Sequence, residues 1–387
     1  KRWIFAFLLV SAVAFAGLFW PEKATDNLKT FNAVDTINYA DVAWLLTASC
    51  LVLLMTPGLS FFYGGMVGKK NVISTMLKSF ICLGVVSLLW VVVAFSMSFG
   101  SPIGPTINGT HYGIIGNPFE FAFFSHVAMN PHSSMASSIP FILFALFQMK
   151  FAIIAPAIIT GSFAERVRFI AYLLFIVLFV IFIYTPLCHW VWHPKGILGA
   201  YFGVKDFAGG TVVHMSAGFA ALAGAMVLGK RKNSAHVPTN IPFVLLGTGM
   251  LWFGWFGFNA GSAVGANGLA VTAFATTHVA AAAAGLSWIL FDVTRGKKVS
   301  ALGFCIGAVV GLVAITPAAG FVTVPVAIFI GVIAAIISNV VAHWRASSNL
   351  DDTLDVFPCH GVGGMVGMLM TGIFATTAVN SAVAELK

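Results

Sequence analysis

The sequence predicts an all-α polytopic membrane protein with ten transmembrane helices. Of its 387 residues, 59% are hydrophobic and only 8% are charged, whereas soluble domains carry about 25% charged residues. Apolar stretches of about 20 residues, the length that crosses a hydrocarbon core of about 30 Å, recur along the whole chain. No linker or water-soluble domain interrupts them. Because an open sheet cannot satisfy its backbone in lipid, we expect one helical membrane domain.

An apolar segment at 3–20 comes first. It follows Lys1 and Arg2 and has small residues near its end, as a secretory signal does, so residues 1–22 are predicted to be a signal peptide or an N-terminal anchor. Ten spans follow within one domain at 41–376, and residues 377–387 form a stub on the outer side. The spans lie near 41–64, 72–99, 137–163, 168–190, 209–229, 241–261, 267–291, 299–316, 321–344 and 356–376.

The basic residues predict the orientation of these spans. The loops alternate between two sides, and eleven Lys and Arg residues fall on one side against five on the other. The more basic side is expected to be cytoplasmic, so the loops near 24–40, 100–136 and 193–207 face outward. We expect a multi-pass protein of the cell (inner) membrane, with the N-terminus of the mature chain outside. The net charge of +8 then reflects topology signals, not a nucleic-acid partner.

Enzyme chemistry is not indicated. The five cysteines are scattered in apolar surroundings without a Cys-x-x-Cys pair, which argues against a disulfide framework or a zinc site. No nucleophile–base set, carboxylate pair or phosphate loop is present. We therefore expect no catalytic residues, no cofactor and no metal.

Two histidines stand out among the few ionisable residues within the predicted spans. Such residues are expensive in hydrocarbon and usually face a cavity or a partner. A lone histidine such as His278 is more often neutral and hydrogen-bonded to a neighbouring helix. His214, in the fifth span, and His360, in the tenth, each follow an aspartate, Asp206 and Asp355 respectively. Glycines and alanines after each histidine allow close packing of helices.

Five spans plus five, an odd number in each half, is typical of an inverted repeat. In such repeats the functional site lies near the midplane, between the halves. Two imidazoles from corresponding positions can hydrogen-bond and pass a proton, because a neutral imidazole has one donor and one acceptor nitrogen. We therefore expect His214 and His360 to meet in the core.

Five motifs resemble the Amt/Rh ammonium transporter family, in the family's order, and cover most of residues 41–376. They are PGLSFFYGGMVGKKN (57–71), FQMKFAIIAPAIITGSFAER (147–166), DFAGGTVVH (206–214), WFGFNAGSA (255–263) and DVFPCHGVGG (355–364). The fourth motif is closer to the Amt branch than to the Rh branch.

This resemblance implies that NH4+ is recruited in an outer vestibule and loses its proton at a phenylalanine gate. Ammonia then passes a pore with two histidines, and the proton is handled separately. The residues that match the recruitment site are Trp192, Ser262, Phe147 and Tyr184. The gate matches Phe151 and Phe258, and the pore matches His214, His360 and Trp255. Asp206 is expected to cap its helix or to support the vestibule from below.

The chemistry of the matched residues suits such a site. A cation over an indole face gains about 0.5–2 kcal/mol, and a serine oxygen can accept an N–H, which an alkali ion lacks. Lys150 directly precedes the gate residue Phe151, but at about 100° per residue it is expected to point away from it. Glu165 and Arg166 fit an ordinary cytoplasmic turn.

The resemblance also implies a homotrimer in the lipid bilayer, with one pore per protomer, that accepts ammonium, ammonia or the analogue methylammonium. The family has an eleventh helix and a cytoplasmic tail engaged by PII-type regulators. That helix is not among the ten spans, and we expect a C-terminal part to be missing from the given chain. Because some members carry a fused signalling domain there, an ammonium sensor that controls such a domain is the alternative to a transporter.

Overall fold

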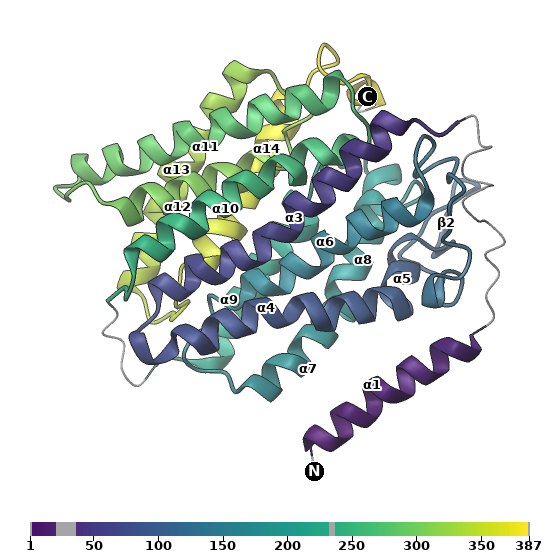
Figure 1. The fold of residues 1–387 in the computed structure, drawn as a ribbon. Coiled ribbons are helices and arrows are strands. Elements are labelled where there is room, and N and C mark those ends of the chain that lie inside the picture. Colours follow the sequence, from purple (N-terminus) through teal and green to yellow (C-terminus); the bar gives the residue numbers. More distant parts are fainter. Residues whose placement is uncertain (1, 21–35, 232–236, 386–387) are drawn as a thin grey trace.

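In the computed structural model, which describes residues 2–20, 36–231 and 237–385, the chain forms a bundle of long helices (Figure 1). Nine helices of the described part are long and apolar enough to cross a membrane. They match nine of the ten predicted spans. The remaining one, predicted near 299–316, is the 15-residue helix α12, Ala301–Ile315. At 1.5 Å per residue it is about 22 Å long, and most of its residues are buried among the other helices.

The first five spans include three that bend through a π-helical turn. They are α3 (Tyr39–Met66); α4 (Val72–Leu89), which continues through η2 (Trp90–Ala94) into α5 (Phe95–Phe99); α6 (Phe141–Ile159); α7 (Phe169–Phe179), which continues through η4 (Val180–Tyr184) into α8 (Thr185–Trp192); and η6 (Gly210–Met215) with α9 (Ser216–Leu228).

The second five spans are straighter, and only the last contains a π-helical turn. They are α10 (Ile241–Ala260) with η7 (Gly261–Ala263), α11 (Gly268–Thr294), α12, α13 (Val324–Ser347), and η8 (Phe357–Val362) with α14 (Gly363–Phe374). The remaining short helical turns are η1 (Lys69–Asn71), η3 (Ala122–Phe124), η5 (Ile197–Tyr201) and η9 (Ser381–Glu385).

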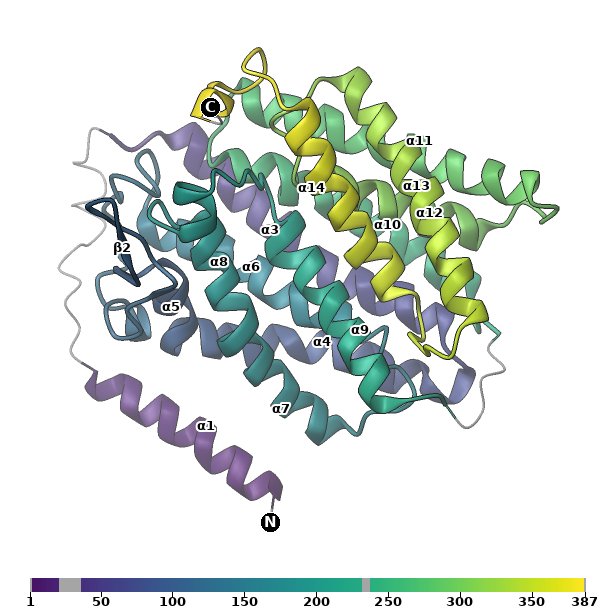
Figure 2. The same ribbon diagram turned by 180° about the vertical axis from the view of Figure 1, so that it is seen from behind.

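Corresponding spans of the two halves pack against each other. The first span, α3, contacts the sixth, α10, and the fifth span contacts the tenth through α9, η6, η8 and α14; Figure 2 shows the second pair from behind. Glycines allow the close approach of α3 and α10, since a methyl group on Gly247 would lie 2.6 Å from the carbonyl oxygen of Gly58. This pairing is the one expected of two five-helix halves that face each other.

Hydrogen bonds show which loops meet at the same end of the bundle. At the end predicted to be outer, Asp41 accepts from the Ser138 hydroxyl at 2.6 Å and from the backbone N–H of Ala266 at 2.8 Å. At the opposite end, Glu165 accepts from the backbone N–H of Gly68 at 3.1 Å. The alternation of loops inferred from the spans is therefore present in the fold.

The predicted outer loop at 100–136 contains the strands of the described part, an exception to the all-α prediction. β1 (Pro102–Ile103) pairs antiparallel with β4 (Ile115–Gly116), and β2 (Thr106–Ile107) pairs with β3 (Thr110–His111). Asn108 and Gly109 connect β2 to β3 with φ of 50° and 78°. Two consecutive positive φ values are what a tight hairpin turn requires, and Asn-Gly is its favoured sequence.

The N-terminal apolar segment forms α1 (Arg2–Phe19), which lies at the edge of the bundle (Figure 1). Trp3 packs 6.2 Å from Phe169, at the start of α7, and Trp20 packs 5.0 Å from Phe123 in the outer loop. Helix α1 therefore runs between the two ends of the bundle. Residues 1, 21 and 22 of the predicted signal or anchor lie outside the described residues.

Candidate functional site

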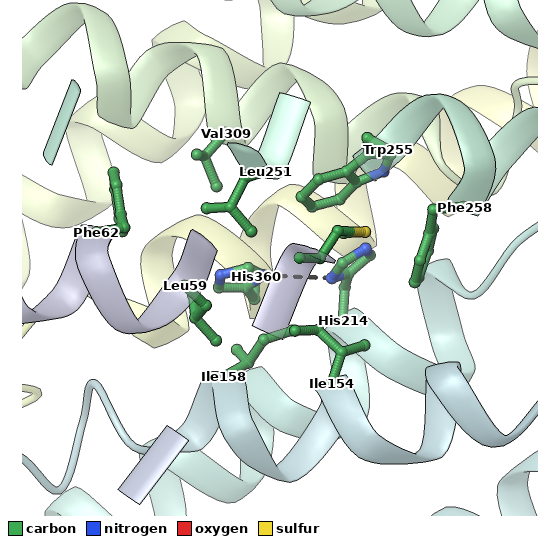
Figure 3. A pocket seen from close by; sticks show the side chains of 11 residues that line it. Leu59, Phe62, Ile154, Ile158, His214, Leu251, Trp255, Phe258, Val309 and His360 are labelled. Carbon is green, nitrogen blue, oxygen red and sulfur yellow. Dashed lines mark hydrogen bonds between the residues drawn. The ribbon is translucent and has the colours of Figure 1, made fainter. Parts of the chain in front are cut away.

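The structure brings His214 and His360 together in the core. Their Nδ1 atoms are 3.2 Å apart and their ring centroids 5.3 Å apart, and both side chains are buried. In this hydrogen bond one Nδ1 carries the proton and donates, and the other Nδ1 is bare and accepts, since a neutral imidazole has one donor and one acceptor nitrogen. Nε2 of His214 is buried and has no hydrogen-bond partner among the described residues. The pair therefore leaves ring nitrogens available to a molecule that passes (Figure 3).

Two π-helical turns and a glycine contact position this pair. His214 lies in η6 and His360 in η8, and π-helical turns occur frequently at functional sites. A methyl group on Gly218 would overlap the backbone nitrogen of Gly361. Only a residue without Cβ allows the fifth and tenth spans to come this close, and this closeness puts both imidazoles within one hydrogen bond.

Asp206 occupies the capping position expected of it. Its carboxylate accepts the backbone N–H groups of Gly209, Gly210 and Thr211 at 2.7–2.8 Å, and a fourth from Val212 lies at 3.4 Å. Burial raises the pKa of Asp206, and the four N–H groups act to lower it. The carboxylate thus satisfies N–H groups that the first turn of a helix leaves without partners.

The parallel drawn in sequence between Asp206 and Asp355 is wrong. Asp355 instead forms an ion pair with Arg345 at 2.6 Å. The counterpart of Asp206 is Asp352, which is buried and accepts the N–H of Phe357, the first residue of η8, at 2.7 Å. Asp352 lies eight residues before His360, as Asp206 lies eight before His214. That equal spacing was the signal in the sequence that identifies it.

A cavity of about 190 Å³ opens beside this centre, toward the end predicted to be outer. The predicted residues Trp192, Ser262 and Phe151 line it. The Ser262 hydroxyl donates to the carbonyl of Phe258 at 2.8 Å, so the hydroxyl oxygen keeps its lone pairs for another donor. The indole N–H of Trp192 donates to the backbone carbonyl of Asp206 at 3.0 Å, which fixes the ring.

Phe147 and Tyr184 do not line this cavity. Phe147 is buried and packs edge-on against Phe151, with centroids 5.0 Å apart. Tyr184 is buried against Trp90 at 6.3 Å. On α6 the residues that face the cavity are Phe144, Gln148 and Phe151. Phe147 lies at the border of this helical stripe, and its ring is covered by its contact with Phe151. Sequence reasoning missed Gln148, although it stands inside a quoted motif.

Phe151, which lines the outer cavity, packs against Phe258, which lines a second, narrower cavity. Their ring centroids are 4.3 Å apart with an interplanar angle of 31°. Trp192 meets Phe151 edge to face at 5.7 Å. Two packed aromatic rings therefore lie between the two cavities.

Beyond these rings lie two cavities of about 10 Å³ each, which share Phe62, Val309 and His360 among their lining residues. A cavity must measure about 10–15 Å³ to hold one water. Figure 3 follows the first of them from Phe258 past His214 and His360 to Phe62. Trp255 stacks on His214 at 5.3 Å and donates its N–H to Thr316 at 2.8 Å. Apart from the histidine pair, Tyr63 and Cys359, the lining is apolar, and the Tyr63 hydroxyl already donates to the carbonyl of Ile158 at 2.9 Å.

Two ionisable residues of the spans lie away from these cavities. Lys150 lines neither part of the route and is partly exposed on α6. His278 is exposed and contacts the rings of Trp252 at 5.4 Å and Phe256 at 6.0 Å. The hydrogen bond to a neighbouring helix that was predicted for His278 is not found among the described residues.

The turn at Glu165 is not the ordinary cytoplasmic turn that was predicted. Glu165 has a φ of 67° and pairs with Arg231 at 3.1 Å, and Arg231 also pairs with Asp351 at 2.9 Å. Burial raises the pKa of Asp351, but the hydrogen bonds and charge of Arg231 outweigh it, so that this pKa is lowered. Three loops that are far apart in the sequence are joined here.

A bundle that crosses the membrane many times, with an open cavity, an aromatic constriction and a narrow passage in its core, defines a multi-pass membrane protein with a route for a small solute. The comparisons with known proteins agree. Residues 43–386 match the sequence model described as the Ammonium Transporter Family. The chain belongs to the ammonium transporter family.

Relatives and solved structures support this assignment. The chain is 45% identical over 341 residues to an ammonium transporter of Aquifex aeolicus, covering 88% of this chain and 78% of that one. It resembles the crystal structure of Saccharomyces cerevisiae Mep2 with a TM-score of 0.83 and 35% identity, over 93% and 79% of the two chains. It also resembles a structure described as a sensor Amt protein, with a TM-score of 0.79, 31% identity, and coverage of 89% and 85%.

Proposed function

We propose that this protein transports ammonium across the membrane by binding NH4+ in the outer cavity and conducting NH3 past the histidine pair. The relatives' description as ammonium transporters supports the substrate. The observation that carries the mechanism is the change in space along the route. A cavity of about 190 Å³ is followed by the Phe151–Phe258 constriction and by cavities of about 10 Å³.

The outer cavity offers what a small cation with N–H donors needs. Ser262 presents a hydroxyl oxygen whose own proton is already donated to Phe258. The aromatic rings of Trp192 and Phe151 line the same space, and a cation near such a ring gains about 0.5–2 kcal/mol. NH4+ can use both interactions at once, whereas K+ has no proton to donate to the serine.

The passage beyond the two phenylalanines favours a neutral molecule. Moving an isolated ion from water into apolar surroundings costs far more than moving a neutral polar group. A space of about 10 Å³ cannot hold the waters that would keep an ion hydrated. We infer that NH4+ gives up its proton at the constriction and continues as NH3, while the proton crosses separately.

The histidine pair gives NH3 polar contacts inside this apolar passage. NH3 both donates and accepts hydrogen bonds, and so does a pair of neutral imidazoles joined through Nδ1. With the proton on one Nδ1, that ring keeps a bare Nε2, and the other ring keeps its proton on Nε2. The pair thus offers one acceptor and one donor along the route, and the shared hydrogen bond gives a proton a way to cross between the two rings.

Flux in proteoliposomes tests this proposal. The purified full chain is reconstituted, an inward ammonium gradient is applied, and current and internal pH are recorded together. We expect a response that saturates with ammonium and that changes in His214→Ala and in His360→Ala. His278→Ala is the matched control, because His278 lies on the outside of the bundle and should leave the response unchanged. Equal responses from liposomes with and without the protein would contradict transport.

A receptor is the second candidate, and the similarity to a sensor Amt protein favours considering it. A receptor needs a binding site and a two-state element, but no continuous route to the cytoplasm. The two candidates differ in one measurement. Saturable ammonium binding without flux under any gradient would support the receptor, and flux that requires both histidines supports the transporter.

We also infer that the protein acts as a homotrimer in the cell membrane, with the Glu165 end in the cytoplasm. The excess of Lys and Arg in the loops at that end supports the orientation. Native mass spectrometry of the detergent-solubilised protein tests the trimer. Labelling of single cysteines, one at each end, by a membrane-impermeant reagent on intact cells tests the orientation.

A further inference from the structure

Gln148 is a polar residue of the outer cavity, and the described part of the chain gives its side chain no hydrogen bond. It lies on α6, three residues before Phe151, and lines the same cavity as Trp192 and Ser262. Its carbonyl oxygen Oε1 is buried and has no hydrogen-bond partner among the described residues. Leaving a buried amide oxygen without a partner is unfavourable, so this position requires an explanation.

The surroundings of Gln148 offer it little to bond with. Most of the residues that line the cavity are aromatic or aliphatic, and the three with uncharged polar side chains are Ser134, Gln148 and Ser262. Ser262 has committed its proton to the carbonyl of Phe258, so it cannot serve as the donor to Gln148. Ser134 is exposed, and its hydroxyl lies 3.4 Å from Nδ1 of His132. Once the amide turns so that its oxygen faces the cavity, the donor that remains for it is a molecule in the cavity.

We propose that Gln148 is a second hydrogen-bond acceptor for the ammonium ion in the outer cavity and increases its specificity for N–H donors. This inference rests on the proposed function and assigns one more residue to the same site. An ammonium ion has four N–H donors and no acceptor. Ser262 accepts one N–H, the amide oxygen of Gln148 accepts a second, and the aromatic rings take the remaining positive surface.

The chemistry of a primary amide suits this role. The terminal torsion of glutamine is broad and roughly two-fold, so a rotation of 180° exchanges the oxygen and the NH2 group within the same space. The oxygen can therefore turn to an ion that enters. Being neutral, the amide attracts cations less strongly than a carboxylate, and it favours a ligand that presents directed N–H groups over a bare ion that needs several oxygens around it.

A spectroscopic experiment can observe this residue alone, because Gln148 is the only glutamine in the sequence. The full chain is made by cell-free synthesis with glutamine labelled with ¹³C at the side-chain carbonyl and is placed in lipid nanodiscs. We expect the carbonyl resonance to shift as ammonium chloride is added, with the same affinity as ammonium binding measured by calorimetry. Equal concentrations of potassium chloride should produce no such shift. A resonance that ignores ammonium while calorimetry records binding would overturn the proposal.

Two substitutions test the energetic contribution. Methionine has nearly the same length as glutamine and no strong acceptor, so Gln148→Met should weaken ammonium binding about tenfold, the effect of one hydrogen bond to a charged donor. Gln148→Glu should tighten the binding of both NH4+ and K+ and reduce the ratio between them. Leu146→Met, on the same helix but outside the cavity, is the control and should bind as the unaltered protein does. Unchanged affinity for ammonium in Gln148→Met would overturn the proposal. If that variant does not fold, unchanged affinity for ammonium in Gln148→Glu would overturn it instead.

Equilibrium binding separates this proposal from the transport proposal. A protein that binds ammonium without conducting it still reports whether Gln148 contributes, because neither calorimetry nor the carbonyl resonance requires flux. If the unaltered protein shows no saturable ammonium binding, both proposals fail. If flux depends on the histidines while Gln148→Met binds normally, only the role of Gln148 fails.

Discussion

Replacing Asp206 by asparagine tests the capping carboxylate most directly. Four backbone N–H groups converge on its two oxygens. Asparagine keeps one oxygen and replaces the other by an NH2 group, which cannot accept. Two of the four N–H groups therefore lose their acceptor in a buried place, at about 1–3 kcal/mol each. The substitution also removes a buried charge, which returns part of this cost, so we expect a net loss of about 2–4 kcal/mol.

Asp352 provides the matched comparison within the same molecule. Within the described part of the chain its carboxylate accepts one backbone N–H, that of Phe357 at 2.7 Å, and the single oxygen of an asparagine can keep this bond. Asp352→Asn should therefore destabilise the protein by less than about 1 kcal/mol. The assay is the midpoint of thermal unfolding of the purified protein in detergent, with the yield of assembled protein measured on the same samples.

The two variants together decide the role of Asp206. A clearly lower midpoint for Asp206→Asn than for Asp352→Asn supports capping. Equal midpoints for both variants and the unaltered protein, with ammonium binding lost only in Asp206→Asn, would refute it. That result would mean that the charge of Asp206 acts on the cation directly.

Three further predictions concern the route and the end of the bundle near the outer cavity. Trp192→Leu should weaken ammonium binding by about 0.5–2 kcal/mol, up to about thirtyfold, because it removes the indole but keeps an apolar side chain; calorimetry that shows unchanged affinity contradicts recruitment by Trp192. His214→Ala should fold normally but discriminate less between ammonium and K+, and an unstable variant with normal selectivity would give His214 a purely structural role. Burial lowers the pKa of His193 to about 3 from its ordinary value of 6.5. The unfolded chain therefore binds a proton at a higher pH than the fold does, and stability is lost as the pH falls from about 6.5 towards 3, by up to about 1.4 kcal/mol per pH unit. His193→Asn should reduce this acid sensitivity in thermal melts at pH 7, 5 and 4, and an unaltered pH dependence contradicts the assignment.

The helices could be predicted from the sequence because each span must satisfy its backbone within lipid. That constraint depends on local composition, and it located nine of the ten spans at a length that crosses a membrane. It was weaker for α12, which has only 15 residues, most of them buried among the other helices. The hairpin at Asn108–Gly109 was missed for a different reason. Outside the membrane, water can satisfy the backbone, so the constraint on secondary structure does not apply. The Asn-Gly pair is then a signal of only two residues and is easily overlooked.

The candidate site was predictable where a residue type is unusual for its surroundings. His214 and His360 stand out in apolar helices, and the structure places their Nδ1 atoms 3.2 Å apart. The sequence was less informative about which neighbours face the cavity. Phe147 and Gln148 are adjacent in one motif, and only the rotation of α6 decides that Gln148 lines the cavity.

Contacts between distant loops could not be predicted at all. Glu165 and Arg231 are 66 residues apart, and nothing in their local sequence indicates that they pair. By contrast, the distinction between Asp352 and Asp355 had a signal in the sequence. Asp352 lies eight residues before His360, the same spacing as between Asp206 and His214, and it is the carboxylate that reaches the start of η8.

The backbone contact between Gly218 and Gly361 limits how this protein can move during its cycle. In many transporters the two halves rock about a central site, which is exposed to one side and then to the other. Here the two helices that carry the histidines touch without side chains between them. A rocking motion of the two halves would therefore have to separate His214 from His360. We therefore expect the backbone around the passage to stay fixed. Transport should then depend on side-chain rotation and on the passage of the solute, and not on a large rigid-body motion of the two halves.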